Sequence, residues 1–442
     1  MRSSTRVTGC RRLCGSSWGG SMARSVTVTG GRDAASGVIP GRYALSVGMP
    51  ELQAAEGFHW RLLTDLARLE SGHTPRRAES SYWDGDVPWI GVRDATANHG
   101  LTISTTNQYI TEAGLANSSA RLLPAGTVCL SRTASVGYVV TMGVPMATSQ
   151  DFVNWVCGPE LSGRYLHYLL MVEQESIRRF AYGTTHQTMY YPEAKALHVC
   201  VPSRREQDAI AEVLGALDDK IAANRKLTDA ALHLADLLVR LSDSWVPIGE
   251  VVEYRKVSRS PERMGADVIA HYSLPAFDSG QLPETTLSQD IKSAKFRIEN
   301  PSVLISKLNP RFPRIWDVAE LPVHPAFAST EFLVLESLHS STSVLAAVLR
   351  HPDVSAQLEM KVAGTSGSHQ RVKPDDLLAT RIPDPRAIGV QTRESITSMG
   401  RLVSRVRNES VELAVLRDTL LPRLMSGELR VRDAERAVEV AL

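Results

Sequence analysis

Two halves of the sequence repeat one series of motifs in the same order. Each half has a Ser-x-acidic-Phe tetrapeptide, a small polar loop ending in His-Gln, a proline, a short apolar segment ending in proline, and a long charged helix pattern. The first half has them at residues 149–152, 183–187, 192, 199–202 and about 206–242, and the second at 329–332, 364–370, 374, 380–383 and about 390–425. A period of about 180 residues is too long for a solenoid and fits a duplicated domain. Two similar domains with a helical spacer indicate a protein that measures something with two separated domains.

Length and composition indicate a globular protein of two or three domains. The 442 residues include 43% hydrophobic and 22% charged side chains, which is ordinary for such domains. No apolar run is long enough to cross a bilayer, so we expect no membrane contact and a cytoplasmic location. The five cysteines are an odd number without a Cys-x-x-Cys pair, which predicts a reducing compartment and no metal site.

The overall charge limits how the chain can bind nucleic acid. The formal net charge is +1 and the isoelectric point is near 7.7. A protein that binds nucleic acid without help is usually more basic. Any DNA affinity is therefore expected to be local, or to be completed by a partner.

Changes in residue composition and periodicity along the chain predict six segments. Short strand patterns with Gly and Pro between them define two mixed domains, and long stretches without Pro define two helices. The predicted segments are a poorly ordered leader or misassigned start at 1–56, a first mixed domain at 57–205, a central helix at 206–243, a second mixed domain at 244–388, a C-terminal helix at 389–430 and a charged, frayed tail at 431–442.

The two long helices carry apolar stripes of matching spacing. In the first, alternating steps of three and four residues join Leu214, Leu217, Ile221, Asn224, Thr228, Ala231, Ala235 and Leu238. In the second, the stripe runs through Leu402, Val406, Glu409, Leu413, Leu416 and Leu420. A helix of roughly 35 residues is about 50 Å long, and polar residues in its seam favour a helical partner in a defined register. We expect the two helices to pair with each other.

Three sequence patterns resemble catalytic motifs without completing them. Asn309-Pro310-Arg311-Phe312 is similar to the Asn-Pro-Pro-aromatic motif of adenine-N6 methyltransferases, but the second proline and a glycine-rich turn for the methyl donor are missing. Asp353, Glu359 and Lys361 are spaced too closely, along one helix pattern, for a nuclease site. The sequence also lacks the Gly-x4-Gly-Lys-Ser/Thr motif that binds nucleotide phosphates. We therefore predict no catalytic residues in this chain.

Two polar loops at matching places are the best candidates for reading DNA. The first contains Thr184, Thr185, His186 and Gln187, and the second contains Ser368, His369, Gln370 and Arg371. Gln pairs with adenine and Arg with guanine in the major groove, while Ser and Thr hydroxyls commonly bind phosphate. A solvated surface turn is the alternative for each loop taken alone. Because the loop occurs at matching places in both halves, the interpretation that these loops bind DNA is strengthened.

A basic run in the second half is a further candidate. Residues 292–316 contain six cationic residues and one acidic residue, Glu299. The cationic residues are Lys292, Lys295, Arg297, Lys307, Arg311 and Arg314. Such a segment can neutralise several phosphates, although a solvated basic face is an equal alternative. We add four residues of the first half to the candidate DNA-binding set: Arg93, Arg132, Thr133 and Ser135.

Four motifs are shared with one known family. They are Ser71-Gly-His-Thr-Pro75 with Tyr82-Trp-Asp-Gly-Asp-Val-Pro-Trp-Ile90, Val201-Pro-Ser-Arg-Arg-Glu-Gln207 with Leu217-Asp-Asp-Lys-Ile221, Leu304-Ile-Ser-Lys-Leu-Asn-Pro-Arg311, and Leu420-Leu-Pro-Arg-Leu-Met-Ser-Gly-Glu-Leu429. On these motifs, from about Trp60 to Val431, the chain resembles the specificity subunit of type I restriction-modification systems. The second half departs from the family pattern because residues 251–256 replace the Ser-Gly-x-Thr-Pro opening. Its domain is therefore expected to read DNA with a differently built rim.

The resemblance implies both a fold and a function. The fold is α+β, with two mixed α/β target-recognition domains separated by two long helices that form an antiparallel coiled coil. Each domain would read half of a split site on double-stranded DNA. The helices, including Leu217, Ile221, Asn224, Leu413, Leu416 and Leu420, would dock two methyltransferase subunits.

The resemblance also assigns the chemistry to partners. The methyltransferase subunits would carry S-adenosylmethionine and the active sites, and a motor nuclease subunit would join them for cleavage in phage defence. This chain would then be non-catalytic, with no cofactor and no metal of its own. Two other classes stay open at this point, a solitary adenine-N6 methyltransferase and a coiled-coil scaffold without a DNA role. The sequence gives neither the recognised bases nor the spacer length, the presence of a nuclease partner or the true N-terminus.

Overall fold

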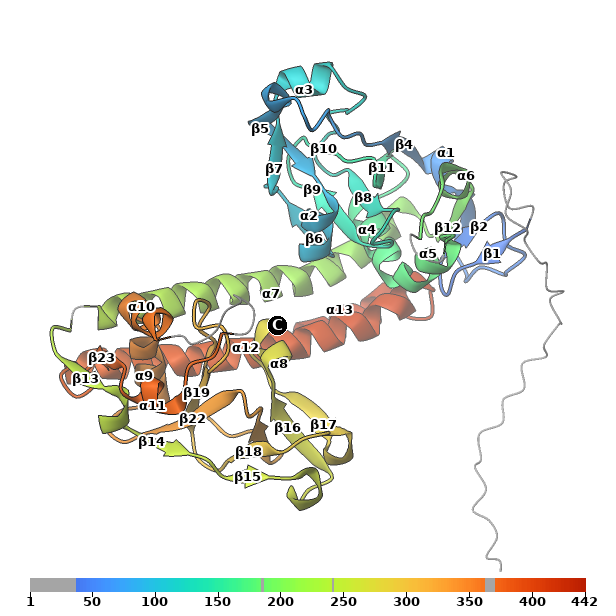
Figure 1. The fold of residues 1–442 in the computed structure, drawn as a ribbon. Coiled ribbons are helices and arrows are strands. Elements are labelled where there is room, and N and C mark those ends of the chain that lie inside the picture. The colour runs from blue at the N-terminus through green and yellow to red at the C-terminus, as the bar shows by residue number, and fades with distance from the viewer. Residues whose placement is uncertain (1–36, 184–186, 241, 362–369) are drawn as a thin grey trace, which may run out of the picture.

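Two mixed domains lie toward opposite ends of a pair of long helices (Figure 1). The computed structural model describes residues 37–183, 187–240, 242–361 and 370–442. The paired helices, α7 (Arg204–Val239) and α12 (Val390–Met425), have 36 residues each, which gives each a length of about 54 Å. They run antiparallel, because Asp218 contacts Arg417 whereas the later Asn224 contacts the earlier Glu409. The predicted α+β architecture with an antiparallel helix pair is confirmed.

The seam between the two helices is mostly apolar, and its buried polar residues include Asn224 and Thr228. Leu217 of α7 and Leu413 and Leu420 of α12 are almost fully buried. Asn224 is also buried, and its Nδ2 donates to Glu409 Oε2 at 2.8 Å. Lys220 Nζ lies 3.3 Å from the other oxygen of Glu409. A single polar pair of this kind fixes helix register, since any slip would leave buried polar atoms without partners.

In its described residues the first domain has three small sheets, six α-helices and one 3-10 helix at Ser80–Tyr82. The strands are β1 (Ile39–Pro40), β2 (Leu45–Val47), β3 (His59–Leu62), β4 (Ala67–Ser71), β5 (Trp83–Ile90), β6 (Leu101–Ile103), β7 (Gln108–Ile110), β8 (Val128–Ser131), β9 (Val139–Met142), β10 (Ala147–Thr148), β11 (Phe152–Cys157) and β12 (Leu197–Val201). The helices are α1 (Leu63–Leu66), α2 (Val92–Ala97), α3 (Glu112–Ala116), α4 (Gly163–Val172), α5 (Gln174–Phe180) and α6 (Tyr191–Lys195). The sheet orders are β1-β2-β12-β3, β10-β5-β7 and β4-β11-β8-β9-β6.

The second domain is built on a similar plan. Its strands are β13 (Trp245–Pro247), β14 (Val252–Arg255), β15 (Ser258–Arg259), β16 (Val268–Tyr272), β17 (Glu284–Leu287), β18 (Lys295–Ile298), β19 (Ser302–Ser306), β20 (Ile315–Val318), β21 (Ala326–Ala328), β22 (Phe332–Ser337) and β23 (Arg381–Pro383). Its helices are α8 (Leu274–Asp278), α9 (Thr342–Leu349), α10 (Pro352–Met360) and α11 (Pro374–Leu378). The sheet orders are β13-β23, β14-β22-β19-β20 and β15-β18-β21-β16-β17.

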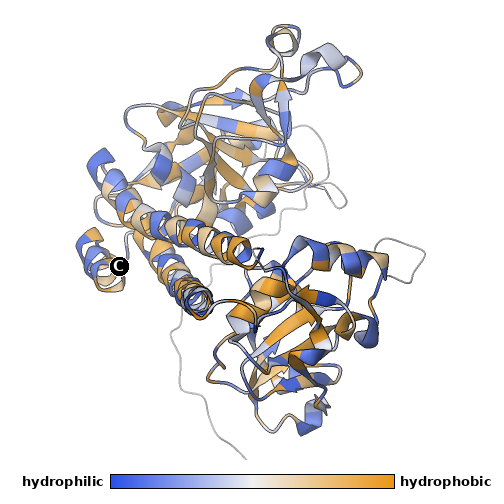
Figure 2. Cartoon of the chain, turned by 90° about the vertical axis from the view of Figure 1, so that its left-hand side faces the viewer, coloured by the Kyte–Doolittle hydropathy of each residue, from blue (hydrophilic) through white to orange (hydrophobic). Residues whose placement is uncertain are grey.

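The repeat in the sequence is a repeat in the topology. The order β4-β11-β8-β9 in the first domain corresponds to β14-β22-β19-β20 in the second, with antiparallel neighbours throughout both. In each domain a helix follows the long central strand, α4 after β11 and α9 after β22. Buried apolar residues of strands and helices form a core cluster in each domain, and the strands inside both domains are coloured largely as hydrophobic in Figure 2. The duplication inferred from the motifs is therefore a duplication of the fold.

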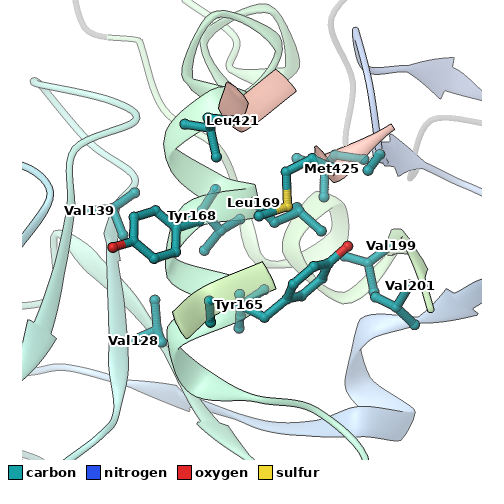
Figure 3. Packing of buried hydrophobic residues seen from close by; sticks show 14 of the residues in the cluster. Val128, Val139, Tyr165, Tyr168, Leu169, Val199, Val201, Leu421 and Met425 are labelled. Atoms are coloured by element: carbon teal, nitrogen blue, oxygen red, sulfur yellow. The ribbon is translucent and has the colours of Figure 1, made fainter. Parts of the chain in front are cut away.

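The first domain shares its core with the helix pair. Tyr165, Tyr168 and Leu169 of α4 pack with Leu421 and Met425 of α12 in one buried cluster (Figure 3). A polar contact also crosses this junction. The Tyr168 hydroxyl donates to Asp218 Oδ2 at 2.6 Å, and the Arg417 guanidinium donates to Asp218 Oδ1 at 2.6 Å.

The second domain is also fixed to both long helices. Arg350, at the end of α9, donates from Nε to Asp236 Oδ1 of α7 at 2.8 Å. On the other side α9 lies close against α12, because a Cβ at Gly400 would stand 2.0 Å from Ser343 Oγ. Any side chain at position 400 would therefore push the domain away from the helix. Each domain is thus held by both helices, and neither helix can change length alone.

The segment before the first predicted strand is part of the first domain. Of the predicted leader at 1–56, residues 37–56 are described, and β2 is fully buried and pairs with β12. The buried Glu173 carboxylate holds this segment, since it accepts the backbone N–H groups of Arg42, Tyr43, Ala44 and Leu45 at 2.6–3.2 Å. The expectation of a poorly ordered leader is therefore wrong for residues 37–56. Their contacts are made with residues about 130 positions later, which no local pattern reveals.

The predicted frayed tail is a helix. α13 (Val431–Ala441) follows Gly427, whose φ of +74° ends α12, and it packs against α7 and α12. Its Ala434 and Val438 are buried, one helical turn apart. Charged residues on the other faces of this helix hide the short apolar stripe in the sequence. In the described part of the chain, no helix is long and apolar enough to span a membrane.

Candidate nucleic-acid interface

Both domains place a cation at the same point of the fold. Strand β8 leads into Arg132, and the corresponding strand β19 leads into Lys307. The Arg132 N–H donates to the Asp151 carbonyl at 2.7 Å, and the Lys307 N–H donates to the Glu331 carbonyl at 2.9 Å. Asp151 and Glu331 are the acidic residues of the repeated tetrapeptide. This tetrapeptide therefore acts first as a backbone partner for the cation-bearing segment.

The predicted His-Gln loops return to these same cations. In the first domain the Ala134 N–H donates to the Gln187 carbonyl at 3.2 Å, and the Met189 N–H donates to the Arg132 carbonyl at 2.9 Å. In the second, Asn309 donates to Gln370 at 2.9 Å and Val372 donates to Lys307 at 3.0 Å. The two hydrogen-bond patterns are the same. They bring together segments about 55 to 65 residues apart in each domain.

A left-handed residue forms the turn beside each cation. Ala134 has a φ of +63° and Asn309 a φ of +54°. Asn adopts this conformation more readily than most residues, and Ala does so at a cost. In both domains it directs the backbone N–H toward the returning glutamine segment. Sequence reasoning missed this turn, and the signal for it was the shared spacing from the strand end.

In the second domain several cations share one acid. Arg371 donates to Glu331 Oε1 at 2.9 Å. Burial lowers the pKa of the Lys307 ammonium; Glu331 opposes this effect, while Arg371 and Lys256 add to it. Around Lys307, the cations Arg371 and Lys256 therefore outnumber the carboxylate of Glu331. The exposed Arg311 lies four residues beyond Lys307. Such a cluster attracts an anionic partner.

In the first domain the cation is held by neighbouring groups. Arg132 Nε donates to the Gln150 carbonyl at 3.0 Å, and its guanidinium lies 5.0 Å from the centre of the Tyr191 ring. The Thr74 hydroxyl bonds to the Gln150 side chain. Gly72 allows this approach, because a Cβ there would stand 2.0 Å from the Ser149 carbonyl oxygen. The Ser-Gly-His-Thr-Pro motif therefore forms part of the rim of this interface, and Gln150 joins the candidate residues.

Comparison with known proteins relates the chain to one family. Residues 56–232 match the family model of the type I restriction modification DNA specificity domain. The likeness to that family model covers about two fifths of the chain. The type I restriction enzyme MjaIX specificity subunit of Methanocaldococcus jannaschii is 30% identical over 185 residues, which are 41% of this chain and 42% of that subunit. The EcoR124I/EcoR124II specificity subunit of Escherichia coli is 25% identical over 167 residues, 36% of this chain and 40% of that subunit.

The matched segment spans about two fifths of each of these two relatives. A solved structure extends the likeness of fold over both domains. The crystal structure of the type I restriction-modification system S subunit from M. genitalium covers 85% of this chain and 98% of its own, with a TM-score of 0.52 and 18% identity. The family resemblance seen in the sequence is confirmed for the matched specificity domain.

The remaining candidate DNA-binding residues fall into two groups. Thr184, Thr185, His186, Ser368 and His369 lie outside the described residues. Thr133 and Ser135 lie on the Arg132 turn of the specificity domain, where the Ser135 N–H donates to the Thr133 carbonyl at 2.7 Å. Arg93 is exposed on α2, directly after strand β5, whose Ile90 carbonyl accepts the Ser149 N–H at 3.0 Å.

The basic run of the second domain does not form one surface. Lys295 is buried, and its Nζ donates to the Ser293 carbonyl at 3.0 Å and to its hydroxyl at 2.7 Å. Arg314 donates in a planar, two-bond arrangement to Asp278 at 2.7 and 2.9 Å. The sequence does not reveal this planar partner, because Asp278 comes from α8, 36 residues away in the chain. Hydrogen bonding from Arg314 lowers the pKa of the Asp278 carboxyl.

Arg311 and Arg314 should therefore respond differently to substitution. Arg311→Ala should weaken binding about equally on all DNA sequences and lower the salt slope by about one unit, because an exposed cation acts through phosphate. Arg314→Ala should leave the salt slope unchanged and lower the free energy of unfolding by about 1 kcal/mol, because its partner Asp278 is half exposed. Binding measured against salt, together with urea unfolding, tests both. A lower slope for Arg314→Ala would contradict the assignment.

The predicted partner-docking residues turn out to hold the helices together. Leu217, Asn224, Leu413 and Leu420 are buried in the seam, and Ile221 and Leu416 are partly buried against the same core. The pairing expected from the two apolar stripes is confirmed, so the four buried side chains are not exposed to a partner. The reason is that the stripe of lowest polarity pairs within the chain. Other apolar residues of the helices are exposed: Leu227, Leu234 and Leu237 on α7 and Val411 and Val415 on α12.

Proposed function

We propose that this chain is the DNA sequence-specificity subunit of a type I restriction-modification complex. Each mixed domain reads one half of a split DNA site. The observation that carries the proposal is the interface repeated at both ends of the helix pair, with a cation, a left-handed turn and a returning glutamine segment in each. The helices, about 54 Å long, exceed one DNA turn of about 34 Å, so two readers can reach successive major-groove faces.

Chemistry at the two sites suits base and phosphate contacts. Arg132 and Lys307 stand two residues before Ala134 and Asn309, whose N–H groups donate to the Gln187 and Gln370 carbonyls. Cations supply phosphate binding, and Gln or Arg side chains supply the base contacts of the major groove. A net charge of +1 leaves most of the phosphate binding to partners. Methyltransferase subunits, carrying S-adenosylmethionine and the active sites, are those partners, and a motor nuclease subunit joins for cleavage.

The exposed apolar residues of the long helices are the proposed docking surface for methyltransferase subunits. Leu227, Leu234 and Leu237 follow one side of α7 at seven- and three-residue steps and are 40–46% exposed. Exposed residues at this spacing form a stripe along a helix. Because the seam residues are already paired, this stripe is what the helix pair offers to a partner.

Leu234→Glu is expected to weaken binding of the methyltransferase subunit by at least about ten-fold, because a charge replaces an apolar contact. Val323→Glu is the matched control, since Val323 is 99% exposed in a loop of the second domain. The control should bind the subunit like the wild type, and both variants should unfold at the parent temperature. Calorimetric titration measures the affinities. Equal affinity for Leu234→Glu and the parent would rule out this surface.

DNA binding tests the proposed function itself. The chain combined with its methyltransferase subunit should shift one split DNA site, identified from the methylated positions in genomic DNA, and the chain alone should shift it weakly. The chain alone should also show no heat of binding with S-adenosylmethionine. Tight methyl-donor binding by the chain alone would instead favour a solitary methyltransferase. A lack of any sequence preference in the complex would favour a scaffold.

A further inference from the structure

Two aromatic side chains are exposed at the two candidate interfaces. Among the Phe, Trp and Tyr residues of the described chain, Tyr190 and Phe312 alone are classed as exposed, at 53% and 65%. Tyr190 follows Met189, which pairs with Arg132 in the first domain. Phe312 follows the turn at Asn309, which pairs with Gln370 in the second. Single exposed apolar residues are common on protein surfaces. Here the exposed aromatic residues coincide with the two sites built independently from backbone geometry.

Both side chains are mounted on constrained backbone. The Phe312 N–H donates to the Asn309 carbonyl at 3.0 Å, and Pro310 and Pro313 flank the turn. Tyr190 precedes helix α6, which has Pro192 in its first turn, and its carbonyl accepts the Ala194 N–H at 3.1 Å. Proline fixes φ and limits the alternatives open to the chain. Because this backbone is already constrained, little further conformational entropy is lost when either ring binds a partner.

The surroundings of both rings favour DNA as the partner. Phe312 is next to the exposed Arg311, and its turn is paired with the segment that carries Arg371. Tyr190 is next to Tyr191, whose ring lies beneath the Arg132 guanidinium. An apolar ring amid cations suits a duplex, in which phosphates flank stacked bases. Proteins that bind DNA insert such side chains between base steps and partly unstack them.

We propose that Tyr190 and Phe312 each insert at one base step, Tyr190 in the first half-site and Phe312 in the second. This rests on the proposed function of the chain. The two rings do not occupy equivalent positions. Aligned on the matched turns at Ala134 and Asn309, Phe312 corresponds to Gly137, whereas Tyr190 corresponds to Lys373 when Met189 is aligned with Val372. The two domains thus deform their half-sites at different distances from the cation. They share one fold but contact DNA in different ways.

The test uses the complex of this chain with its methyltransferase subunit and the DNA site mapped from methylation. The fluorescent base 2-aminopurine, placed at successive positions of each half-site, reports unstacking as a rise in emission. Wild-type protein should produce a rise at one step in each half. Phe312→Ala should abolish the rise in the second half alone, and Tyr190→Ala in the first alone. Each should weaken binding between about five- and about a hundred-fold without changing the salt slope.

Conservative and distant variants serve as controls. Phe312→Tyr and Tyr190→Phe keep a ring and should retain the emission rise. Leu287→Ala and Leu122→Ala remove exposed apolar residues elsewhere in the two domains and should behave like the wild type. The proposal would be overturned if the wild-type complex bound its DNA site without any rise in 2-aminopurine emission. It would also be overturned if the alanine variants lost the methyltransferase subunit while the emission rise stayed unchanged. Absence of any site-specific shift by the wild type would overturn the proposed function as well.

Discussion

Exchanging the first domain for that of another specificity subunit is expected to change one half of the methylated DNA site and leave the other half unchanged. The two domains have separate sheets and separate sets of interface hydrogen bonds, so neither reader depends on the other for its geometry. The exchange must run over residues 37–203. A boundary at residue 57 or 60 would remove β1 and β2 from the sheet that β12 completes.

The measurement for this exchange is the set of methylated positions in the genome of a host that carries the hybrid. The donor domain should keep a Tyr at the position of Tyr168, because its hydroxyl bonds to Asp218 at the junction with the helices. The reciprocal control replaces residues 244–389 and should change only the other half-site. A hybrid that alters both halves together would show that the domains read DNA jointly.

Lengthening the helix pair is expected to move the preferred site to a longer gap between its halves. A heptad inserted after Asn224 must be matched by one after Asn408, because both domains are fixed to both helices. With both insertions the Asn224–Glu409 pair and the apolar seam are retained. The readers then separate by about 10 Å, roughly the length of three base pairs.

The helical twist of DNA sets the strength of the new complex. Three added base pairs turn the second half-site by nearly a third of a turn, since one turn holds about 10.5 pairs, whereas a heptad rotates the reader by about 20°. Binding to the parent site should fall by at least about ten-fold, and the best site should have a gap longer by a few pairs, bound less tightly than in the parent complex. Affinities for duplexes with gaps from the parent length to four pairs longer measure the shift.

Three outcomes of the helix insertions can be separated. A heptad inserted in one helix alone should prevent assembly, because the two domain junctions would no longer be aligned. Two residues inserted in both helices should also prevent assembly, because the seam residues would then face solvent. An unchanged gap preference after matched heptads would show that the helices do not set the distance between the readers. Urea unfolding of the lengthened chain checks that the seam is intact.

The sequence by itself determined the repeat and the two long helices. The motifs that mark each half are local strings, and helical stripes of three and four residues are visible along one stretch of chain. Matched glutamines at Gln187 and Gln370 follow from the repeat alone, and the structure places both in the same backbone pairing. The resemblance to adenine-methyltransferase motifs at Asn309 also has a structural explanation. Its equivalent, Ala134, makes the same left-handed turn without any side-chain amide.

The tertiary structure decided which side chains are free to bind. Lys295 and Arg314 look like members of a basic surface in the sequence, but Ser293 and Asp278 take up their donor groups. The same holds for the long helices, where Leu217 and Leu413 are buried while Leu227 and Val415 stay exposed. Glu173 fixes a strand segment about 130 residues before it. Periodicity and motifs are properties of neighbouring residues, whereas charge neutralisation and burial depend on groups that only folding brings together.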